Sequence, residues 1–254
     1  MTTPTVTAAS RGRISAYLLR YQLGDFLLLR AGLPSILVTL LGFMLWKTAS
    51  ATDWTTPNGV RFSNEMFRIL AGMFIMLGGF MGVARIVADD RSNGYYRFLL
   101  SKPISLERFY VQQWLLHGAG LIVLTGLLSA WLQGGTGPIP IREALIVMGL
   151  TWLFIGGIGF LLSVLTNADA LLLVLLYVVS SMLHGIKDAP SSPMWPWLQQ
   201  VTRIFPPVQK LDFVRSQLYS GADIPWMHVA HVAGYGALAF VAGVIVLRRT
   251  SFAR

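Results

Sequence analysis

Residues 143–165 read EALIVMGLTWLFIGGIGFLLSVL, an apolar run in which Glu143 is the single charged residue. The hydrocarbon core of a bilayer is about 30 Å thick, and a helix that rises about 1.5 Å per residue crosses it in about 20 residues. Strands of a membrane barrel would instead alternate apolar and polar residues over about ten positions. Runs of comparable length and polarity occur at residues 26–46, 66–88, 110–132, 169–186 and 229–247. The sequence therefore predicts an all-α polytopic membrane protein with six transmembrane helices.

The composition agrees with a protein whose main solvent is lipid. Hydrophobic residues make up 54% of the 254 residues and charged residues 12%, and the mean hydropathy is +0.61. A chain of this length cannot hide so much apolar surface in one globule beneath an ordinary charged surface. A disordered chain and a soluble nucleic-acid binder are excluded as well, although the net charge is +9. We expect membrane lipids around the helices and no nucleic-acid partner.

Basic residues are concentrated in particular connections between the predicted spans. An even number of spans puts both termini on one side of the membrane, and an excess of Lys and Arg marks the cytoplasmic side. The N-terminal segment, the loop after the second span and the C-terminal tail carry Arg11, Arg13, Arg20, Arg91, Arg97, Lys102, Arg108, Arg248, Arg249 and Arg254. We therefore predict cytoplasmic N and C termini and a multi-pass protein of the inner, cytoplasmic membrane.

The spans divide the chain into a short N-terminal segment, a membrane domain and a tail. Residues 26–247 form the six-helix transmembrane domain, which includes an inner loop at 89–109 and an outer proline-rich segment at 187–228. The outer segment holds six of the 12 prolines, which excludes a seventh span there. Residues 248–254 form the cytoplasmic tail.

The N-terminal segment, residues 1–25, has an apolar face. Ile14, Tyr17, Leu18 and Tyr21 recur at helical spacing beside arginines. Such a segment is typical of a basic amphipathic helix on the inner membrane surface. The alternative is a straight helix that extends the first span inward.

The inner loop at residues 89–109 reads DDRSNGYYRFLLSKPISLERF. Asn93-Gly94 is a turn signal, and residues 95–100 can form a short helix. Pro103 ends that helix because the residue before a proline is pushed out of the α region, and Ser105 is the predicted N-cap of the third span. A surface helix this rich in Tyr, Phe and Leu is more apolar than water tolerates, so the loop predicts a protein partner.

Several motifs of enzymes are absent from the chain. Without a G-x-x-x-x-G-K-[ST] motif, any ATP is hydrolysed on another polypeptide. Neither H-E-x-x-H nor G-x-S-x-G occurs, and the chain has no cysteine. His228 and His231, three apart at the end of the last span, could bind a metal, but a histidine pair bonded to water or backbone is the commoner case. We predict a chain that is not an enzyme, with no catalytic residue, no metal site and no cofactor of its own.

Charged groups within the spans are few. Apart from Glu143 at the start of its run, they are Arg30, Arg68, Arg85 and Asp169, and each lies within reach of an interface. A carrier driven by protons or sodium needs acidic groups near the midplane, and a selective channel needs a charged ring. The spans therefore argue against both of these classes.

Together these features resemble the type-2 permeases of ATP-binding-cassette transporters, which are the membrane subunits of exporters. The architecture is similar over nearly the whole chain, whereas the match of specific residues is confined to 89–109. In that family an acidic-basic-x-x-G pattern leads a coupling helix and is followed by a leucine pair and a P-[IV]-S-R motif. Asp90-Arg91-Ser92-Asn93-Gly94, Leu99-Leu100 and Pro103-Ile104-Ser105 stand in those places. Leu106 stands where the family often has arginine, and Gln112-Gln113 where it commonly has Gly-Lys, which leaves the subfamily open.

The resemblance implies a permease that moves its substrate by alternating access, driven by a separate cytoplasmic ATP-binding-cassette ATPase. ATP and Mg would be bound by that ATPase. Family members work as two permeases with two ATPases, so a second permease copy, identical or related, is implied too. The residues implied to couple the chain to the ATPase are Asp89, Asp90, Arg91, Tyr95, Tyr96, Arg97, Phe98, Leu99, Leu100 and Pro103. The substrate and its binding residues are not identified.

The alternative is a membrane anchor or scaffold subunit that does not transport. Its inner loop would dock a partner without passing on any movement. Stimulation of the ATPase by substrate separates the two, because an anchor has no reason to alter turnover.

Overall fold

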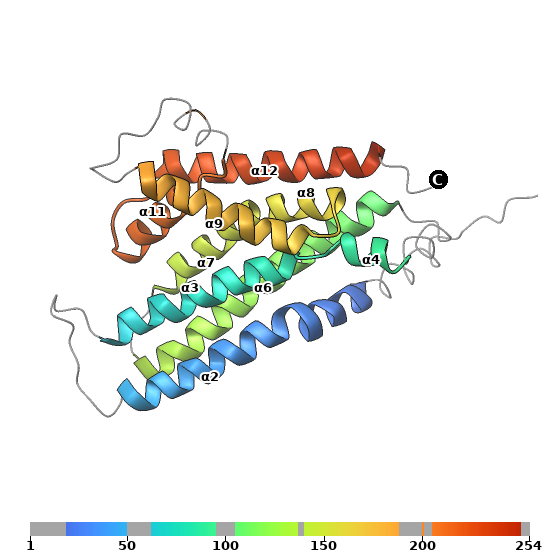
Figure 1. Ribbon diagram of the computed structural model, residues 1–254. Coiled ribbons are helices and arrows are strands. Elements are labelled where there is room, and N and C mark those ends of the chain that lie inside the picture. Colours follow the sequence, from blue (N-terminus) through green and yellow to red (C-terminus); the bar gives the residue numbers. More distant parts are fainter. Residues whose placement is uncertain are drawn as a thin grey trace, which may run out of the picture.

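The computed structural model describes residues 19–49, 62–94, 105–136, 140–187 and 205–249, together with Gln200. Throughout these residues the regular structure is helical, which confirms the all-α prediction (Figure 1). Two of the segments, η1 and η2, are π-helical insertions within longer helices. The elements are η1 (Phe26–Ala31), α2 (Gly32–Ala49), α3 (Phe62–Val83), α4 (Ala88–Ser92), α6 (Leu106–Thr136), α7 (Ile141–Thr151), η2 (Trp152–Gly156), α8 (Gly157–Leu165), α9 (Asp169–Lys187), α11 (Val208–Tyr219) and α12 (Trp226–Arg249).

Within the described parts of the chain, five helical stretches are long and apolar enough to cross a bilayer, which indicates a multi-pass membrane protein. Each contains or overlaps one of the predicted spans. The sixth predicted span, 169–186, lies in α9, whose described apolar part, Asp169–Leu183, is shorter than the other five. The five stretches are Leu19–Met44, Ile69–Ser92, Leu106–Gln133, Ile141–Leu165 and Trp226–Arg249.

The boundaries of the first two helices differ most from the predicted ones. Residues 19–25 are already helical and run without a break into η1 and α2, so this part of the N-terminal segment extends the first span. Residues 13–18 of the predicted amphipathic helix lie outside the described residues. The second helix ends early, because α3 stops at Val83, the chain turns, and α4 begins at Ala88.

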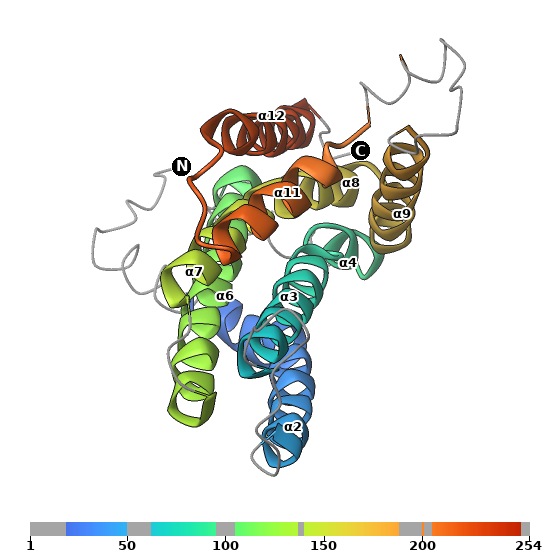
Figure 2. The ribbon, with the colours of Figure 1, turned by 90° about the vertical axis from the view of Figure 1, so that its left-hand side faces the viewer.

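The long helices lie roughly side by side, and their connections gather at two opposite ends (Figures 1 and 2). We call one end the α4 end; it holds α4, the start of α6, the turn between α8 and α9, and the last residues of α12. We call the other the α11 end; it holds α11, the end of α2 and the start of α3. At that end α11 packs against α7, α9 and α12.

Helices α8 and α12 pack closely because glycines remove side chains from their contact. A Cβ on Gly157 would overlap the backbone of Gly236, and a Cβ on Gly236 would overlap the backbone of Leu153. Farther along α12, Gly243 lies against the ring of Phe160. Close backbone approach of this kind stabilises helix pairs in lipid through van der Waals packing, because burial of apolar surface contributes little free energy of association there.

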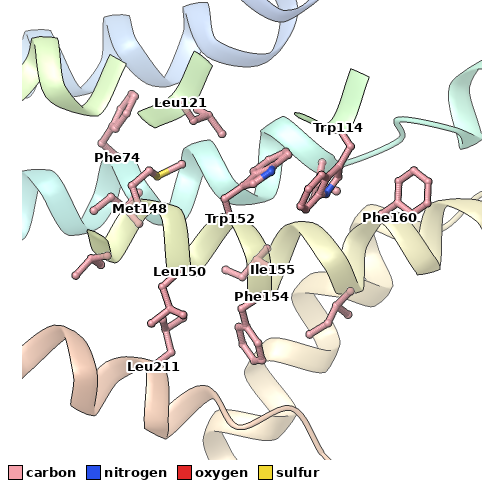
Figure 3. Packing of buried hydrophobic residues seen from close by; sticks show 14 of the residues in the cluster. Phe74, Trp114, Leu121, Met148, Leu150, Trp152, Phe154, Ile155, Phe160 and Leu211 are labelled. Atoms are coloured by element: carbon pink, nitrogen blue, oxygen red, sulfur yellow. The ribbon is translucent and has the colours of Figure 1, made fainter. Parts of the chain in front are cut away.

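Aromatic side chains fill the space beside this contact. The Trp114 ring lies between those of Trp152 and Phe240, with centroid distances of 5.5 and 4.2 Å. Figure 3 shows Trp114 and Trp152 side by side in the buried cluster, with Phe160 beyond them. These contacts join α6 to η2 and α12 in the centre of the bundle.

A substitution at Gly236 tests the close approach. We expect Gly236→Ala to destabilise the fold by about 1–3 kcal/mol, the usual cost of overpacking a filled core. Gly185→Ala on α9 is the control, because nothing lies within 4 Å of its Cβ position. Thermal unfolding of the purified protein in detergent measures both. Equal midpoints for the two variants would contradict the described packing of α8 on α12.

Candidate functional site

A sharp turn joins α3 to α4 and is held by side chains from the α8–α9 hairpin. Arg85 in this turn has a φ of 61°, in the left-handed region that residues with a Cβ seldom adopt. Its N–H donates to Asp169 Oδ2 at 2.6 Å. The N–H groups of Val87 and Ala88 both donate to Ser163 Oγ, at 2.9 and 3.0 Å. Strained backbone of this kind persists where surrounding groups hold it, and it is concentrated at functional sites.

Arg91 on α4 makes a second link to the same hairpin. Its Nε donates to Asn167 Oδ1 at 2.8 Å, and its Nη1 donates to the carbonyl of Val164 at 2.8 Å. The hairpin turn lies in the three-residue gap between the predicted spans 143–165 and 169–186, since α8 ends at Leu165 and α9 begins at Asp169. The α8–α9 connection therefore carries the bonds that place α4.

Arg30 binds the end of α3 from the first helix. The last carbonyls of a helix have no partner within it and attract a cation. Arg30 Nη1 donates to the carbonyls of Met81 and Ala84. Its Nη2 lies 3.6 Å from Asp89 Oδ2 and its Nε 3.7 Å from Asp25 Oδ2. With 12% of its side chain exposed, Arg30 is largely shielded among these groups.

The two acidic residues of α4 have different partners. Asp89 accepts a bond from Arg85 Nε at 2.8 Å, one helical turn away, in addition to its pairing with Arg30. Asp90 Oδ2 accepts the hydroxyl hydrogen of Tyr110, which is buried near the start of α6, at 3.1 Å. Through these contacts α4 is attached to the first helix, to α6 and to the α8–α9 hairpin.

The structure places part of the predicted coupling site. Asp89, Asp90 and Arg91 lie together on α4, at one end of the bundle. The remaining predicted coupling residues lie outside the described residues, and the coupling role of the whole set stays a prediction. They are Tyr95, Tyr96, Arg97, Phe98, Leu99, Leu100 and Pro103.

Both flanks of the undescribed segment match the predicted local structure. Asn93-Gly94 forms a turn in which Gly94 has a φ of 71° and its N–H donates to the Arg91 carbonyl. Ser105 precedes α6, and its carbonyl accepts the N–H of Phe109 at 3.1 Å, as an N-cap residue does. The predicted turn and helix start are confirmed.

Three of the residues that hold α4 were visible in the sequence only as isolated charges of the spans. Arg30, Arg85 and Asp169 were each predicted to lie within reach of an interface. The structure also brings them together at the α3–α4 turn, and Asp169 has only 1% of its surface exposed. Ser163 and Asn167 complete the set, and nothing in the spacing of a serine or an asparagine marks such a role. The available signal was the rarity of charge in the spans, since intramembrane charges usually pair.

The two candidate histidines, His228 and His231, contact other side chains. Among the residues that the structure describes, no cluster of three or more His, Asp or Glu side chains could hold a metal ion. His231 Nδ1 lies 3.1 Å from Lys210 Nζ, and the His228 ring packs on Phe213 with centroids 4.9 Å apart. Both contacts are to side chains, rather than to the water or backbone that was the commoner expectation for this histidine pair.

Comparison of the chain with protein-family models, with curated proteins and with solved structures gave no match. The function is therefore inferred from the chain's own residues.

Removal of the Ser163 hydroxyl tests whether the α8–α9 hairpin stabilises the α3–α4 turn. In Ser163→Ala the N–H groups of Val87 and Ala88 lose their acceptor, which costs about 1–3 kcal/mol for a buried donor. We expect amide hydrogen exchange at these two positions to speed up by about 5- to 150-fold. The control is Ser92→Ala, because the exposed Ser92 hydroxyl bonds only to the Asp89 carbonyl of its own helix. Unchanged exchange in Ser163→Ala would show that the hairpin does not hold the turn.

Proposed function

We propose that this chain is the membrane-spanning permease subunit of an ATP-binding-cassette transporter of the exporter type. It would move its substrate by alternating access, driven by a separate cytoplasmic ATPase that binds ATP and Mg. The observation that carries this proposal is the attachment of α4 to three parts of the bundle, directly before the apolar segment at residues 95–100. A segment of that composition suits insertion into a cleft on a partner, and its family-like motif matches a coupling helix.

The contacts around α4 support a mechanical role. A displacement of residues 95–103 by a partner would be transmitted to α4 through the Asn93-Gly94 turn. Arg30, Tyr110 and the Arg91–Asn167 bond would then pass the movement to the first helix, α6 and the α8–α9 hairpin. The turn at Arg85 lets α4 change direction relative to α3, since the α-helical backbone is already interrupted there. Switches between conformations commonly use such hinges at the ends of helices.

The proposed topology has six spans with the α4 end in the cytoplasm. Helix α9 has 19 residues, or about 28 Å of helix, close to the thickness of a bilayer core. Both termini then face the cytoplasm, and the membrane is the inner one. The positive-inside rule supports this orientation, because the α4 end carries Arg20, Arg30, Arg85, Arg91, Arg108, Arg248 and Arg249.

Two single-cysteine variants test this topology, and they are clean probes because the chain has no cysteine of its own. Ala168→Cys lies in the exposed turn at the α4 end, and Ala222→Cys lies in the exposed connection at the α11 end. We expect a membrane-impermeant maleimide to label Ala222→Cys in intact cells and Ala168→Cys only after permeabilisation. Labelling of both positions in intact cells would refute the six-span arrangement.

The proposed assembly contains a second permease copy, identical or related. Small residues in the spans allow close helix contacts. Gly78 and Gly82, four residues apart on α3, face Leu121, and Gly243 on α12 faces Phe160, all within this chain. Gly234 on α12 has nothing within 4 Å of its Cβ position, so its surface is open to another helix. We place a contact with the second copy on this part of α12, with lipid around the rest.

Charge substitutions in the undescribed segment test the docking to the ATPase. We expect Tyr96→Asp or Leu99→Asp to abolish co-purification with the ATPase, because a carboxylate would have to be buried in an apolar cleft. Ala222→Asp is the control, since it adds the same charge at the opposite end of the molecule. An ATPase retained by all three variants would count against the loop as the docking element.

The ATPase rate of the reconstituted complex with the ATPase distinguishes a permease from an anchor. For a permease, substrate raises the ATPase rate of the reconstituted complex, and Ser163→Ala weakens that response while the ATPase stays bound. An ATPase rate that never responds to any transported compound would favour the scaffold subunit.

A further inference from the structure

A cavity of about 660 Å³ opens between α3 and α11. Binding sites for drug-sized molecules commonly span about 300–1,000 Å³. The side chains that decide its chemistry are Ile69, Met73, Met76 and Leu77 from α3, and Arg215 and Ser216 from α11. The cavity therefore has one long apolar wall and a polar edge.

The apolar wall is accessible. Ile69 has 55% of its surface exposed and Met73 39%. Methionine adapts its shape to different ligands because its side chain is unbranched and polarisable. A glycine at position 72 widens this wall, since a Cβ there would meet only Arg215 Nη1, at 3.9 Å.

The polar edge carries one cationic group. Arg215 Nη2 pairs with Asp212 Oδ1 at 3.0 Å, and Nη1 lies on the side of Gly72. Asp212 thus orients the guanidinium while Nη1 is turned toward the cavity. A guanidinium is the side chain best suited to a carboxylate or phosphate oxygen, because its N–H groups form a planar fork.

We propose that this cavity binds an amphipathic anion, whose apolar body lies along α3 and whose single phosphate, sulfate or carboxylate group reaches Arg215. The assignment of this ligand as the cargo rests on the proposed permease function, whereas its binding does not. The cavity and the α4 turn share one helix, α3. Arg30 pairs with Asp89 of α4 and donates to the carbonyls at the end of α3, so a movement of α4 that displaces Arg30 would reach the wall that contacts the ligand. Ligand binding in this cavity would therefore be mechanically linked to the movement of α4.

The test uses the full chain in nanodiscs of neutral phosphatidylcholine, without the ATPase. A dansyl-labelled fatty acid reports on the site, and four competitors are compared: dodecyl phosphate, dodecanol, dodecyltrimethylammonium and inorganic phosphate. We expect dodecyl phosphate to displace the probe at a concentration about 10- to 100-fold lower than dodecanol does, as a charge-assisted hydrogen bond predicts. Inorganic phosphate and the cationic amphiphile should not displace it.

Three variants locate the binding. Arg215→Gln should remove the preference for dodecyl phosphate over dodecanol. Gly72→Leu should weaken the binding of dodecyl phosphate and of dodecanol alike, because a side chain then occupies the cavity. This variant keeps the Arg215–Asp212 pair, so it still tests the site if Arg215→Gln fails to fold. Lys210→Gln is the matched control, since Lys210 lies on α11 but contacts His231 rather than the cavity.

If dodecyl phosphate and dodecanol displace the fluorescent fatty acid equally well from the unaltered protein, the proposal is overturned. Equal displacement would mean that both compounds act only by partitioning into the bilayer. The same conclusion follows if Gly72→Leu binds as the unaltered protein does. Because the ATPase is absent from this assay, a failure here leaves the docking result untouched. Conversely, if the docking experiment fails, the anion site remains, but its ligand is no longer assigned as the transported cargo.

Discussion

The bonds that close the α3–α4 turn are the constraint on which the rest of the α4 end depends. A helix that breaks in or near a bilayer exposes N–H and C=O groups that no water can satisfy in the hydrocarbon core, so the protein must supply the partners. Here Ser163 and Asp169 accept the N–H groups of the turn, and Arg30 donates to the carbonyls at the end of α3. These bonds determine where α4 lies and in which direction the chain continues toward residue 95.

The position of α4 has consequences for the remainder of the bundle. Because its partners come from the first helix, α6 and the α8–α9 hairpin, α4 cannot move far without disturbing all three. The contact between α8 and α12 is packed through glycines and leaves little room for adjustment, so it forms a rigid frame at the centre. Helix α3 extends from the α4 turn to the cavity at the α11 end. Arg30 bonds to both α4 and the end of α3, so a displacement of α4 has a route through Arg30 and along α3 to the apolar wall of the cavity.

Much of the fold could be predicted from the sequence, because hydrophobic run length and turn chemistry are local properties. The 143–165 run, the short turn before Asp169 and the Asn93-Gly94 turn all occur as predicted. The helix end at Val83 was not predicted, since 66–88 is apolar apart from Arg68 and Arg85. The left-handed conformation of Arg85 is stabilised by a tertiary bond to Asp169. The extension of the first helix back to residue 19 was one of two alternatives that the pattern left open.

The sequence by itself determined that this chain is helical, that lipid is its main solvent and that its basic residues are unevenly distributed. Each of these follows from residue type and spacing along the chain. Only the tertiary structure decided which charges meet, because Arg30, Arg85, Asp89 and Asp169 are brought together from segments far apart in the sequence. The same holds for the cavity between α3 and α11, which exists because a helix from the proline-rich segment packs into the bundle. Pairing across helices depends on how they rotate and approach one another, and in lipid that geometry is set by close packing rather than by local pattern.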